Sequence, residues 1–383
     1  MSKRTICFIT GTRAEYGLLK PVMEKVSKDN ELHLQIIATA MHLSPEFGMT
    51  YQEIEADGFT IDEKNEMLLS SDTSVGISKS IGLGVISFAE SFQRLKPDLI
   101  VVLGDRFEIL AAAQAALIAR IPLAHIAGGD ITEGAWDESI RHAITKMSHI
   151  HFVTNQGSFN RVKQLGENPQ HIFNVGSTGI DNILHQKFLA KEYLQEELGF
   201  LFRKKNILVT FHPSTLDFIP ASKQFAQLLS ALHHLGEDVG IIITKPNADL
   251  EGRSLFPLIE AFVKEHQNAK AFESLGQERY LSVMNTVDMV VGNSSSGLYE
   301  APSFKIPTIN IGSRQKGRLQ ANSVINCEPD EQSVVHAMER GFALDCSETL
   351  NPYGTGHASE SIVSVLKSFD NYKSLLTKPF FNL

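Results

Sequence analysis

Short apolar runs, rich in Ile, Val and Leu, alternate with amphipathic stretches along most of the chain. In the first half, the runs that we expect to form strands are residues 5–10, 32–39, 98–103, 122–126, 149–153 and 172–175. The stretches expected to form helices between them are residues 18–26, 75–95, 108–119, 137–147 and 156–165. Strands that are apolar on both faces and separated by helices are typical of a parallel sheet covered on both sides. The first half is therefore predicted to be a doubly wound α/β domain.

The same alternation resumes after a polar pause between residues 181 and 205. Further strands are expected at residues 206–210, 239–244, 269–272, 289–291, 307–311 and 324–327, and further helices at residues 222–235, 250–265, 279–285, 297–302 and 331–340. We therefore predict two Rossmann-like α/β domains, residues 1–180 and 181–356, which suits a length of 383 residues. The C-terminal segment, residues 357–383, is expected to pack back on the first domain.

Composition excludes several classes of function. The chain has 44 acidic and 35 basic residues, so no nucleic-acid partner is expected, because such proteins need a basic surface. No apolar stretch approaches the ~20 residues that span a bilayer, so no membrane partner is expected either. The three cysteines are too few and too far apart for a disulfide framework, which favours a cytoplasmic protein. His149 and His151 have no third ligand at a supporting spacing, so no metal is expected.

Ligands of open α/β sheets bind at the carboxyl ends of the strands, so the residues that follow each strand are the candidates for a site. After the first strand, Gly11 leads into a helix start that could bind an anion, and Arg13 could bind phosphate or form a surface salt bridge. Asp105 and Arg106 follow the strand 98–103. They could be a structural ion pair, but their position favours a functional role. Neither a P-loop nor a G-x-G-x-x-G turn is present, which disfavours Walker NTPases and simple NAD(P) binding.

The loop 127–138 is rich in glycine and carboxylates. Clustered carboxylates raise one another's pKa and can hold a proton near neutral pH, which suits acid–base chemistry. Asp130 and Asp137 are therefore candidate catalytic residues. Asp137 could also cap the following helix and pair with Arg141, and both interpretations can hold together.

Polar residues also follow the strands of the second half. His212 follows the strand 206–210, although a lone histidine is more often structural. Asn247 and Asp249 follow the strand 239–244 and suit sugar hydroxyls.

The small-residue run 292–297 offers backbone and hydroxyl donors for a diphosphate, with Ser294 and Ser295 at its centre. Glu300 lies one turn further on and could accept both hydroxyls of a ribose. Arg314, within the run 312–318, adds a cation.

Six segments in this order resemble the hydrolysing UDP-N-acetylglucosamine 2-epimerases of sialic-acid and related nonulosonic-acid biosynthesis. They are GTRAEYG, GDR, DESIRHAITKMSHIHF, FHP, GNSSSGLYE and INIGSRQKGR, between residues 11 and 318. The resemblance implies the GT-B fold, with an active site in the cleft between two Rossmann-like domains, a UDP-sugar substrate and no cofactor. It further implies a homodimer or homotetramer.

The resemblance also implies roles for single residues. Asp105, Asp137 and His212 match positions that the family treats as catalytic. The residues that would bind the substrate are Arg13, Arg106, His42, Ser294, Ser295, Glu300 and Arg314. His125, His149 and His151 match further histidines of relatives.

Two positions depart from the family pattern. Ala127 stands where animal members and non-hydrolysing bacterial relatives have a catalytic Glu, and Asp130 is a possible substitute for it. Gly17 stands where animal relatives have a Ser.

The reaction implied is elimination of UDP from the sugar to give a 2-acetamidoglycal, followed by addition of water, which releases a free sugar inverted at C2. The substrate would be UDP-N-acetylglucosamine or its 2,4-diacetamido-6-deoxy analogue. The alternatives are a GT-B glycosyltransferase, a non-hydrolysing 2-epimerase and a catalytically silent nucleotide-sugar sensor. The carboxylate-rich loop 127–138 speaks against the glycosyltransferase, because such enzymes need little acid–base chemistry at C2.

Overall fold

The computed structural model describes residues 3–69, 71, 73–132, 136–213, 219–246 and 254–383, which form two compact units. Apart from Thr132, which groups with the second unit, the first unit contains the described residues up to 131 together with 136–182 and 353–383. The second unit contains the described residues of 183–352. The chain thus leaves the first unit after Asn182, near the predicted boundary, and returns to it at Tyr353.

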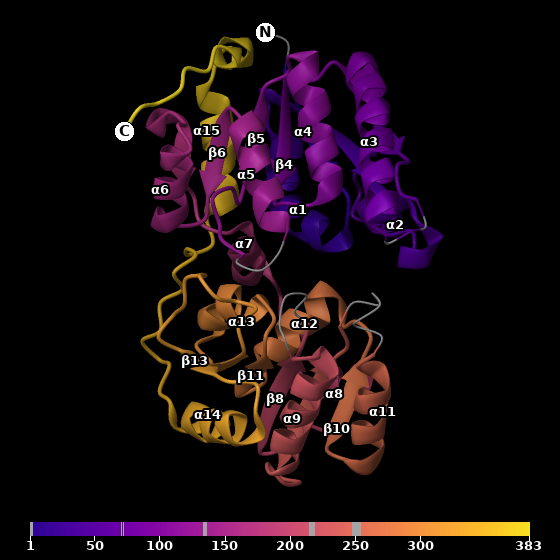
Figure 1. The fold of residues 1–383 in the computed structure, drawn as a ribbon, viewed down its shortest axis with the longest axis vertical. Coiled ribbons are helices and arrows are strands. Elements are labelled where there is room, and N and C mark those ends of the chain that lie inside the picture. The colour runs from indigo at the N-terminus through magenta and orange to yellow at the C-terminus, as the bar shows by residue number, and fades with distance from the viewer. Residues whose placement is uncertain (1–2, 70, 72, 133–135, 214–218, 247–253) are drawn as a thin grey trace. The chain divides into compact units, whose positions relative to one another are not determined.

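The first unit is built on a seven-stranded parallel sheet of order β3-β2-β1-β4-β5-β6-β7. Figure 1 labels β4, β5 and β6 of this sheet. Its strands are β1 Arg4–Thr10, β2 Leu32–Thr39, β3 Glu63–Asn65, β4 Leu99–Leu103, β5 Leu123–Ile126, β6 Ile150–Val153 and β7 Ile172–Asn174. Its longer helices are α1 Arg13–Lys28, α3 Ser74–Leu95, α4 Phe107–Ala119, α5 Asp137–Met147, α6 Gln156–Gln164 and α15 Ala358–Ser368. Shorter helices are α2 Tyr51–Ala56, α7 Thr178–His185 and the 3-10 turn η1 Ala40–Leu43.

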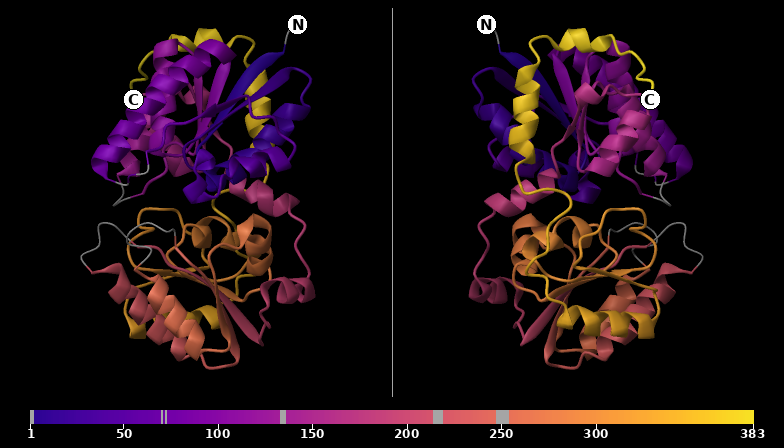
Figure 2. Two further views of the ribbon diagram at one scale, coloured as in Figure 1. Left: turned by 90° about the vertical axis from the view of Figure 1, so that its right-hand side faces the viewer. Right: turned by 90° about the vertical axis from the view of Figure 1, so that its left-hand side faces the viewer.

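Two apolar layers cover this sheet, one on each face. One layer joins α1 and α15 to the side chains of β1, β2 and β4 that point toward them, and the other joins α3, α4 and α5 to the opposite face. The C-terminal helix α15 packs beside α1 in the first unit (Figure 2), so residues far apart in sequence share one core.

The second unit is a six-stranded parallel sheet of order β10-β9-β8-β11-β12-β13. Its strands are β8 Lys205–Thr210, β9 Val239–Thr244, β10 Ala269–Phe272, β11 Met289–Gly292, β12 Thr308–Ile311 and β13 Val324–Cys327. Its helices are α8 Lys191–Leu198, α9 Ala221–His233, α11 Phe256–Glu265, α12 Gly276–Met284, α13 Ser296–Tyr299 and α14 Glu331–Ala343. The helices α9, α11 and α14 cover one face, and α8 and α12 pack on the other.

Each sheet has one point at which the strand order reverses. In the first sheet β1 lies between β2 and β4, and in the second β8 lies between β9 and β11. The loops that leave adjacent strands at such a point diverge and open a crevice at the carboxyl edge of the sheet. The ends of β1 and β4, and those of β8 and β11, are therefore the places to look for a site. None of the helices within the described residues is long and apolar enough to cross a bilayer.

Candidate active site

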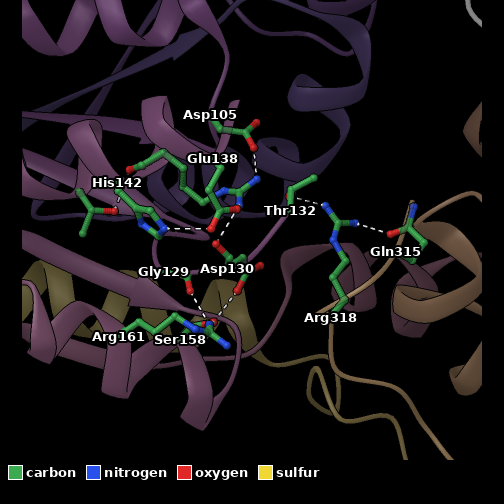
Figure 3. Close-up of polar contacts among 12 residues, drawn as sticks. Asp105, Gly129, Asp130, Thr132, Glu138, His142, Ser158, Arg161, Gln315 and Arg318 are labelled. Atoms are coloured by element: carbon green, nitrogen blue, oxygen red, sulfur yellow. Dashed lines mark hydrogen bonds and ion pairs between the residues drawn. The ribbon is translucent and has the colours of Figure 1, made fainter. Parts of the chain in front are cut away.

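At the reversal point of the first sheet, the turn after β4 is fixed by an arginine from α5. Asp105 forms an ion pair with Arg141, whose side chain is almost completely buried (Figure 3). Arg141 also donates to the main-chain oxygen of Asp130 at 2.8 Å and lies 3.6 Å from Glu138. One guanidinium therefore holds Asp105 against the loop that follows β5.

Arg106 follows Asp105 in the chain, and its main contact is with Glu108 in the first turn of α4. Its Nε donates to Oε1 of Glu108 at 2.5 Å, and Nη2 lies 3.7 Å from the Sδ of Met41. About a third of its side chain is exposed. Arg13 is different, because nearly half of its side chain is exposed and its ion pair with Glu53 is 3.9 Å long. Of these two predicted phosphate ligands, Arg106 has the shorter ion pair and the less exposed side chain.

Asp137 is the first residue of α5, one position inside the helix. The residue before the helix is Trp136, which makes no side-chain capping bond, so the prediction that Asp137 caps the helix is not what the structure shows. Burial raises the pKa of the Asp137 carboxyl, the charge of Arg106 opposes this, and the charge of Glu108 adds to it. A partly buried carboxyl with raised proton affinity thus stands within electrostatic reach of Arg106.

Asp130 lies in a cradle of hydroxyl groups at the start of α6. Its Oδ1 accepts from Ser158 at 2.6 Å and from Thr154 at 2.7 Å, and the residue is 7% exposed. These two bonds tie the loop after β5 to the turn after β6 and the start of α6. Figure 3 shows Asp130 beside Ser158. The observed contacts of Asp130 are those of a residue that fixes a loop.

Four histidines of the first unit, His42, His125, His149 and His151, are buried, and burial lowers the pKa of each. His42 bridges the hydroxyls of Thr10 and Thr50 at 3.1 and 2.8 Å, and burial lowers its pKa to about 4. His125 lies 2.7 Å from the Gly104 oxygen through Nε2, which supports the turn before Asp105. His149 directly precedes β6, and His151 lies within β6 in register with His125 of β5, so neither follows a strand end as Asp105 and Arg106 do. Among the described residues, no cluster of three or more His, Cys, Asp and Glu side chains could hold a metal ion.

At the reversal point of the second sheet, His212 and Asn293 clamp the ends of β8 and β11 together. The His212 N–H donates to Oδ1 of Asn293 at 2.7 Å, and Nδ2 of Asn293 donates back to the His212 oxygen at 2.8 Å. Gly292 precedes this clamp with a φ of +135°, where a Cβ would meet the Thr210 oxygen at 1.9 Å. Burial, and then the charge of Arg314, lower the pKa of His212 to about 4. The imidazole at this site is therefore uncharged at neutral pH.

The predicted UDP ligands lie around the same strand ends. Ser294 and Ser295 lead into the short helix α13, and Glu300 follows it. Burial raises the pKa of Glu300 to about 7, and its Oε2 is buried with no hydrogen-bond partner among the described residues. Arg314 donates to the Asn293 oxygen at 2.9 Å, and burial together with Arg318 lowers its pKa to about 10. Asn247 and Asp249, the other predicted ligands, lie outside the described residues.

Sequence reasoning missed two further acidic residues at the first reversal point, Glu15 and Glu108. Both are buried, and Glu108 binds Arg106. A signal was available for Glu108, because it is the only charged residue of the otherwise apolar helix α4. Arg141 was noted only as a partner for Asp137, whereas the structure pairs it with Asp105.

Comparison with known proteins identifies the family. A family model described as UDP-N-acetylglucosamine 2-epimerase matches residues 24–367. A Campylobacter jejuni protein named GDP/UDP-N,N'-diacetylbacillosamine 2-epimerase (hydrolyzing) is 44% identical over 86% of this chain and 85% of its own. The Legionella pneumophila UDP-N,N'-diacetylbacillosamine 2-epimerase (hydrolyzing) is 33% identical over 98% of each chain. The Escherichia coli polysialic acid biosynthesis protein P7 is 34% identical over 99% of this chain and 98% of its own.

Solved structures share the fold. The UDP-GlcNAc 2-epimerase of Neisseria meningitidis, solved with UDP-GlcNAc bound, matches with a TM-score of 0.82 at 20% identity over 95% of this chain and 100% of that one. The Staphylococcus aureus MnaA–UDP structure matches with a TM-score of 0.77 at 20% identity over 99% of this chain and 100% of that one. The expected fold of two Rossmann-like units is thus confirmed. The relatives' names also confirm the expected class of enzyme, a hydrolysing 2-epimerase. By the family model and by its full-length relatives, the chain belongs to the UDP-N-acetylglucosamine 2-epimerase family.

Proposed function

We propose that the chain hydrolyses a UDP-linked 2,4-diacetamido-6-deoxy sugar, UDP-N,N'-diacetylbacillosamine, and inverts the sugar at C2. The choice of this sugar over UDP-N-acetylglucosamine is supported by two relatives that carry that name, at 44% and 33% identity. The chemistry is supported above all by one observation, the Asp137 carboxyl of raised pKa within electrostatic reach of Arg106.

The first half of the reaction is an elimination. A base removes the proton from C2, the electron pair of the C2–H bond becomes the C1–C2 double bond, and the C1–O bond breaks with UDP as leaving group. Asp137 and Asp105 are the proposed proton-transfer groups of the first unit. Burial raises the pKa of the Asp137 carboxyl. One positioned proton-transfer group contributes ~10²–10⁴ in rate.

The second half is a hydration. Water adds its hydroxyl to C1 of the 2-acetamidoglycal, and a proton is delivered to C2 on the face opposite to the one that lost it. A free sugar inverted at C2 leaves together with UDP. His212, uncharged at neutral pH, is the proposed proton-transfer group of the second unit. Ala127 provides no carboxylate, and the contacts of Asp130 favour a role in shaping the loop.

UDP is proposed to bind at the reversal point of the second sheet. Ser294 and Ser295 would donate to the diphosphate, Glu300 would accept from the ribose hydroxyls, and Arg314 would lie close to the nucleotide. Arg106 would stabilise the charge that develops on the departing diphosphate, as pre-placed donors do in other enzymes.

Roles for Arg13, His42, Asn247 and Asp249 in substrate binding stay predictions. So do a homodimer or homotetramer and a cytoplasmic location.

The test is incubation with UDP-N,N'-diacetylbacillosamine and with UDP-N-acetylglucosamine, each in heavy water and without an acceptor, followed by NMR of the products. We expect free UDP and a free C2-inverted sugar with deuterium at C2, formed faster from the diacetamido substrate. An epimer that remains linked to UDP would identify a non-hydrolysing epimerase. Turnover that begins only when an acceptor is added would identify a glycosyltransferase. Binding of the UDP-sugar without any turnover would identify a sensor. Hydrogen retained at C2 would contradict the elimination route.

A further inference from the structure

Two buried glutamates lie at the reversal point of the first sheet, and the proposed reaction does not use them directly. Glu15 is in the first turn of α1 and is 4% exposed, whereas Glu108 is in the first turn of α4 and is 0% exposed. The helices that carry them follow the adjacent strands β1 and β4, so the two side chains meet at one place in the fold.

That place is Gly11, directly after β1. The Gly11 N–H donates to Oε2 of Glu15 at 2.6 Å. A Cβ added to Gly11 would lie 2.5 Å from Oε1 of Glu108. Gly11 is not among the glycines with a left-handed φ, so the close approach of Glu108 is what requires a glycine here. Both carboxyl groups thus converge on one residue.

The charges around this pair are unequal. Oε1 of Glu108 accepts from Arg106 at 2.5 Å, but Oε1 of Glu15 and Oε2 of Glu108 are buried without a hydrogen-bond partner among the described residues. The charges of Arg106 and Glu108 also act on the Asp137 carboxyl. His42 donates its main-chain N–H to the Gly11 oxygen, and burial lowers the pKa of its imidazole to about 4. Arg106 is the cation that acts on Glu15. Two buried carboxylates against one cation would leave an uncompensated charge out of water, which is costly.

We propose that Glu15 and Glu108 are positioning residues that share one proton over Gly11 and so present a single negative charge to Arg106. This proposal rests on the function proposed above, in which Arg106 faces the leaving diphosphate. With one charge, the pair orients the guanidinium through its Nε and balances the guanidinium charge without exceeding it. If the shared proton is lost, the second carboxylate competes with the phosphates for Arg106.

The direction of the pKa agrees with this arrangement. Burial, and then the charge of Glu108, raise the pKa of Glu15 to about 8, although the Gly11 N–H and Arg106 act to lower it. The pair therefore holds its proton at neutral pH and releases it in mildly alkaline solution.

The kinetic test compares Glu15→Gln with Glu108→Gln. The amide that replaces the Glu15 carboxyl cannot ionise, so we expect the alkaline fall in kcat/KM to move upward by at least about one pH unit while the acid limb stays in place. Glu108→Gln removes the charge that orients Arg106. We expect it to raise the KM by roughly 10-fold or more, the ratio that corresponds to the loss of one hydrogen bond to a charged group. The matched control is Glu55→Gln, an exposed partner of Lys64, which should leave both limbs and the KM unchanged. An alkaline limb that is the same in Glu15→Gln and in the parent would overturn the proposal.

A second readout does not depend on turnover. The side-chain carboxyl carbons of ¹³C-labelled glutamate report each protonation state by NMR, and an ordinary Glu titrates near ~4.3. We expect the full-length parent to show two carboxyls that titrate far above this value, one lost in Glu15→Gln and the other in Glu300→Gln. If Glu15→Gln does not fold, the single high-titrating carboxyl that remains in Glu300→Gln provides the test, and its absence refutes the shared proton. If the enzyme turns over but shows no such carboxyl, the shared proton is refuted and the proposed function stands. If the carboxyl is present but no substrate turns over, only the proposed function is refuted.

Discussion

The first unit has buried glutamates at both the amino edge and the carboxyl edge of its sheet, and they differ in how fully they are paired. At the amino edge, Glu167 lies 2.7 Å from Nζ of Lys146, 2.8 Å from Nζ of Lys378 and 2.9 Å from Nε2 of His151. Burial would raise the pKa of Glu167, but hydrogen bonds from these three groups lower it to about 2. At the carboxyl edge, Oε1 of Glu15 has no hydrogen-bond partner in the described part of the chain, and the pKa of Glu15 is raised.

The difference separates two uses of buried charge in one sheet. The amino-edge cluster ties down the C-terminal segment, because Lys378 also donates to the main-chain oxygens of Lys146 and Ser148 at 2.6 Å each. Nearby, Phe380 fills the space beside Gly166. Full pairing there stabilises the fold. Incomplete pairing at the carboxyl edge leaves groups whose charge can change, which is what a site for proton transfer needs.

The largest effect is expected at Asp137, where Asn keeps the shape but cannot take a proton. We expect Asp137→Asn to lower turnover by at least ~10²-fold, the contribution of one proton-transfer group. The melting temperature should stay within a few degrees of the parent's, because Asp137 is not the helix cap. Steady-state kinetics and calorimetry with UDP measure the two properties. Loss of UDP affinity with unchanged turnover would break the comparison, because the carboxyl edge would then bind and not catalyse.

Glu167→Gln should produce the largest effect on stability and none on the KM. Removing one partner of a buried ion pair costs about 3–5 kcal/mol, because the lysines are left uncompensated. Glu55→Gln, at an exposed pair, should cost ~1 kcal/mol or less. Chemical denaturation of the parent and both variants gives the free energies of unfolding. Equal losses of unfolding free energy in the two variants would mean that the contacts of Glu167 at the amino edge do not stabilise the fold.

The pH dependence of stability sharpens the same contrast. The pKa of Glu167 is lowered in the folded state, so its contribution is present above ~4.5 and is lost as the pH falls toward 2. The pKa of Glu15 is raised, so its contribution is present below ~4.5 and is lost as the pH rises through about 8. In a plot of the free energy of unfolding against pH, Glu167→Gln should therefore flatten the acid end and Glu15→Gln the alkaline end. Curves that change at the same end would contradict the assignment.

The strands of both sheets could be predicted almost to the residue, because apolar β-branched runs mark buried parallel strands. The exception among the strands is β3, Glu63–Asn65, which is too short and too polar to show a period. Short helices such as α2, Tyr51–Ala56, were missed for the same reason. The sequence could place candidate site residues where they lie just after a strand, as Asp105 and His212 do, and their roles stay predictions. Their partners could not be predicted, since the choice of Asp105 by Arg141 and the hydroxyl cradle of Asp130 depend on how distant turns pack.

Arg106→Ala should weaken UDP binding by roughly 1.5–3 kcal/mol, the scale of a hydrogen bond to a charged group. Arg13→Ala is the matched variant, and its effect should be smaller, since Arg13 is half exposed and its ion pair is long. Calorimetry with UDP measures both. Unchanged affinity in Arg106→Ala would remove Arg106 from the diphosphate site and, with it, the reason for a single charge on the Glu15–Glu108 pair.

The smallest effect is expected at Glu300, which repeats in the second sheet the incomplete pairing seen at Glu15. Its Oε2 has no partner among the described residues and its pKa is raised to about 7, so at pH 6 the carboxyl is largely protonated. Ribose hydroxyls that donate to the ionised form would lower this pKa, so UDP binding at pH 6 should release a fraction of a proton. Calorimetry of UDP binding in two buffers of different ionisation enthalpy counts that proton. Glu300→Gln should abolish the release and raise the KM more than it lowers kcat, because ribose contacts act on ground and transition state alike. Equal proton release in parent and variant would show that Glu300 does not contact the nucleotide. Glu300 and Glu15 would then share only their burial, and not a role in binding the substrate.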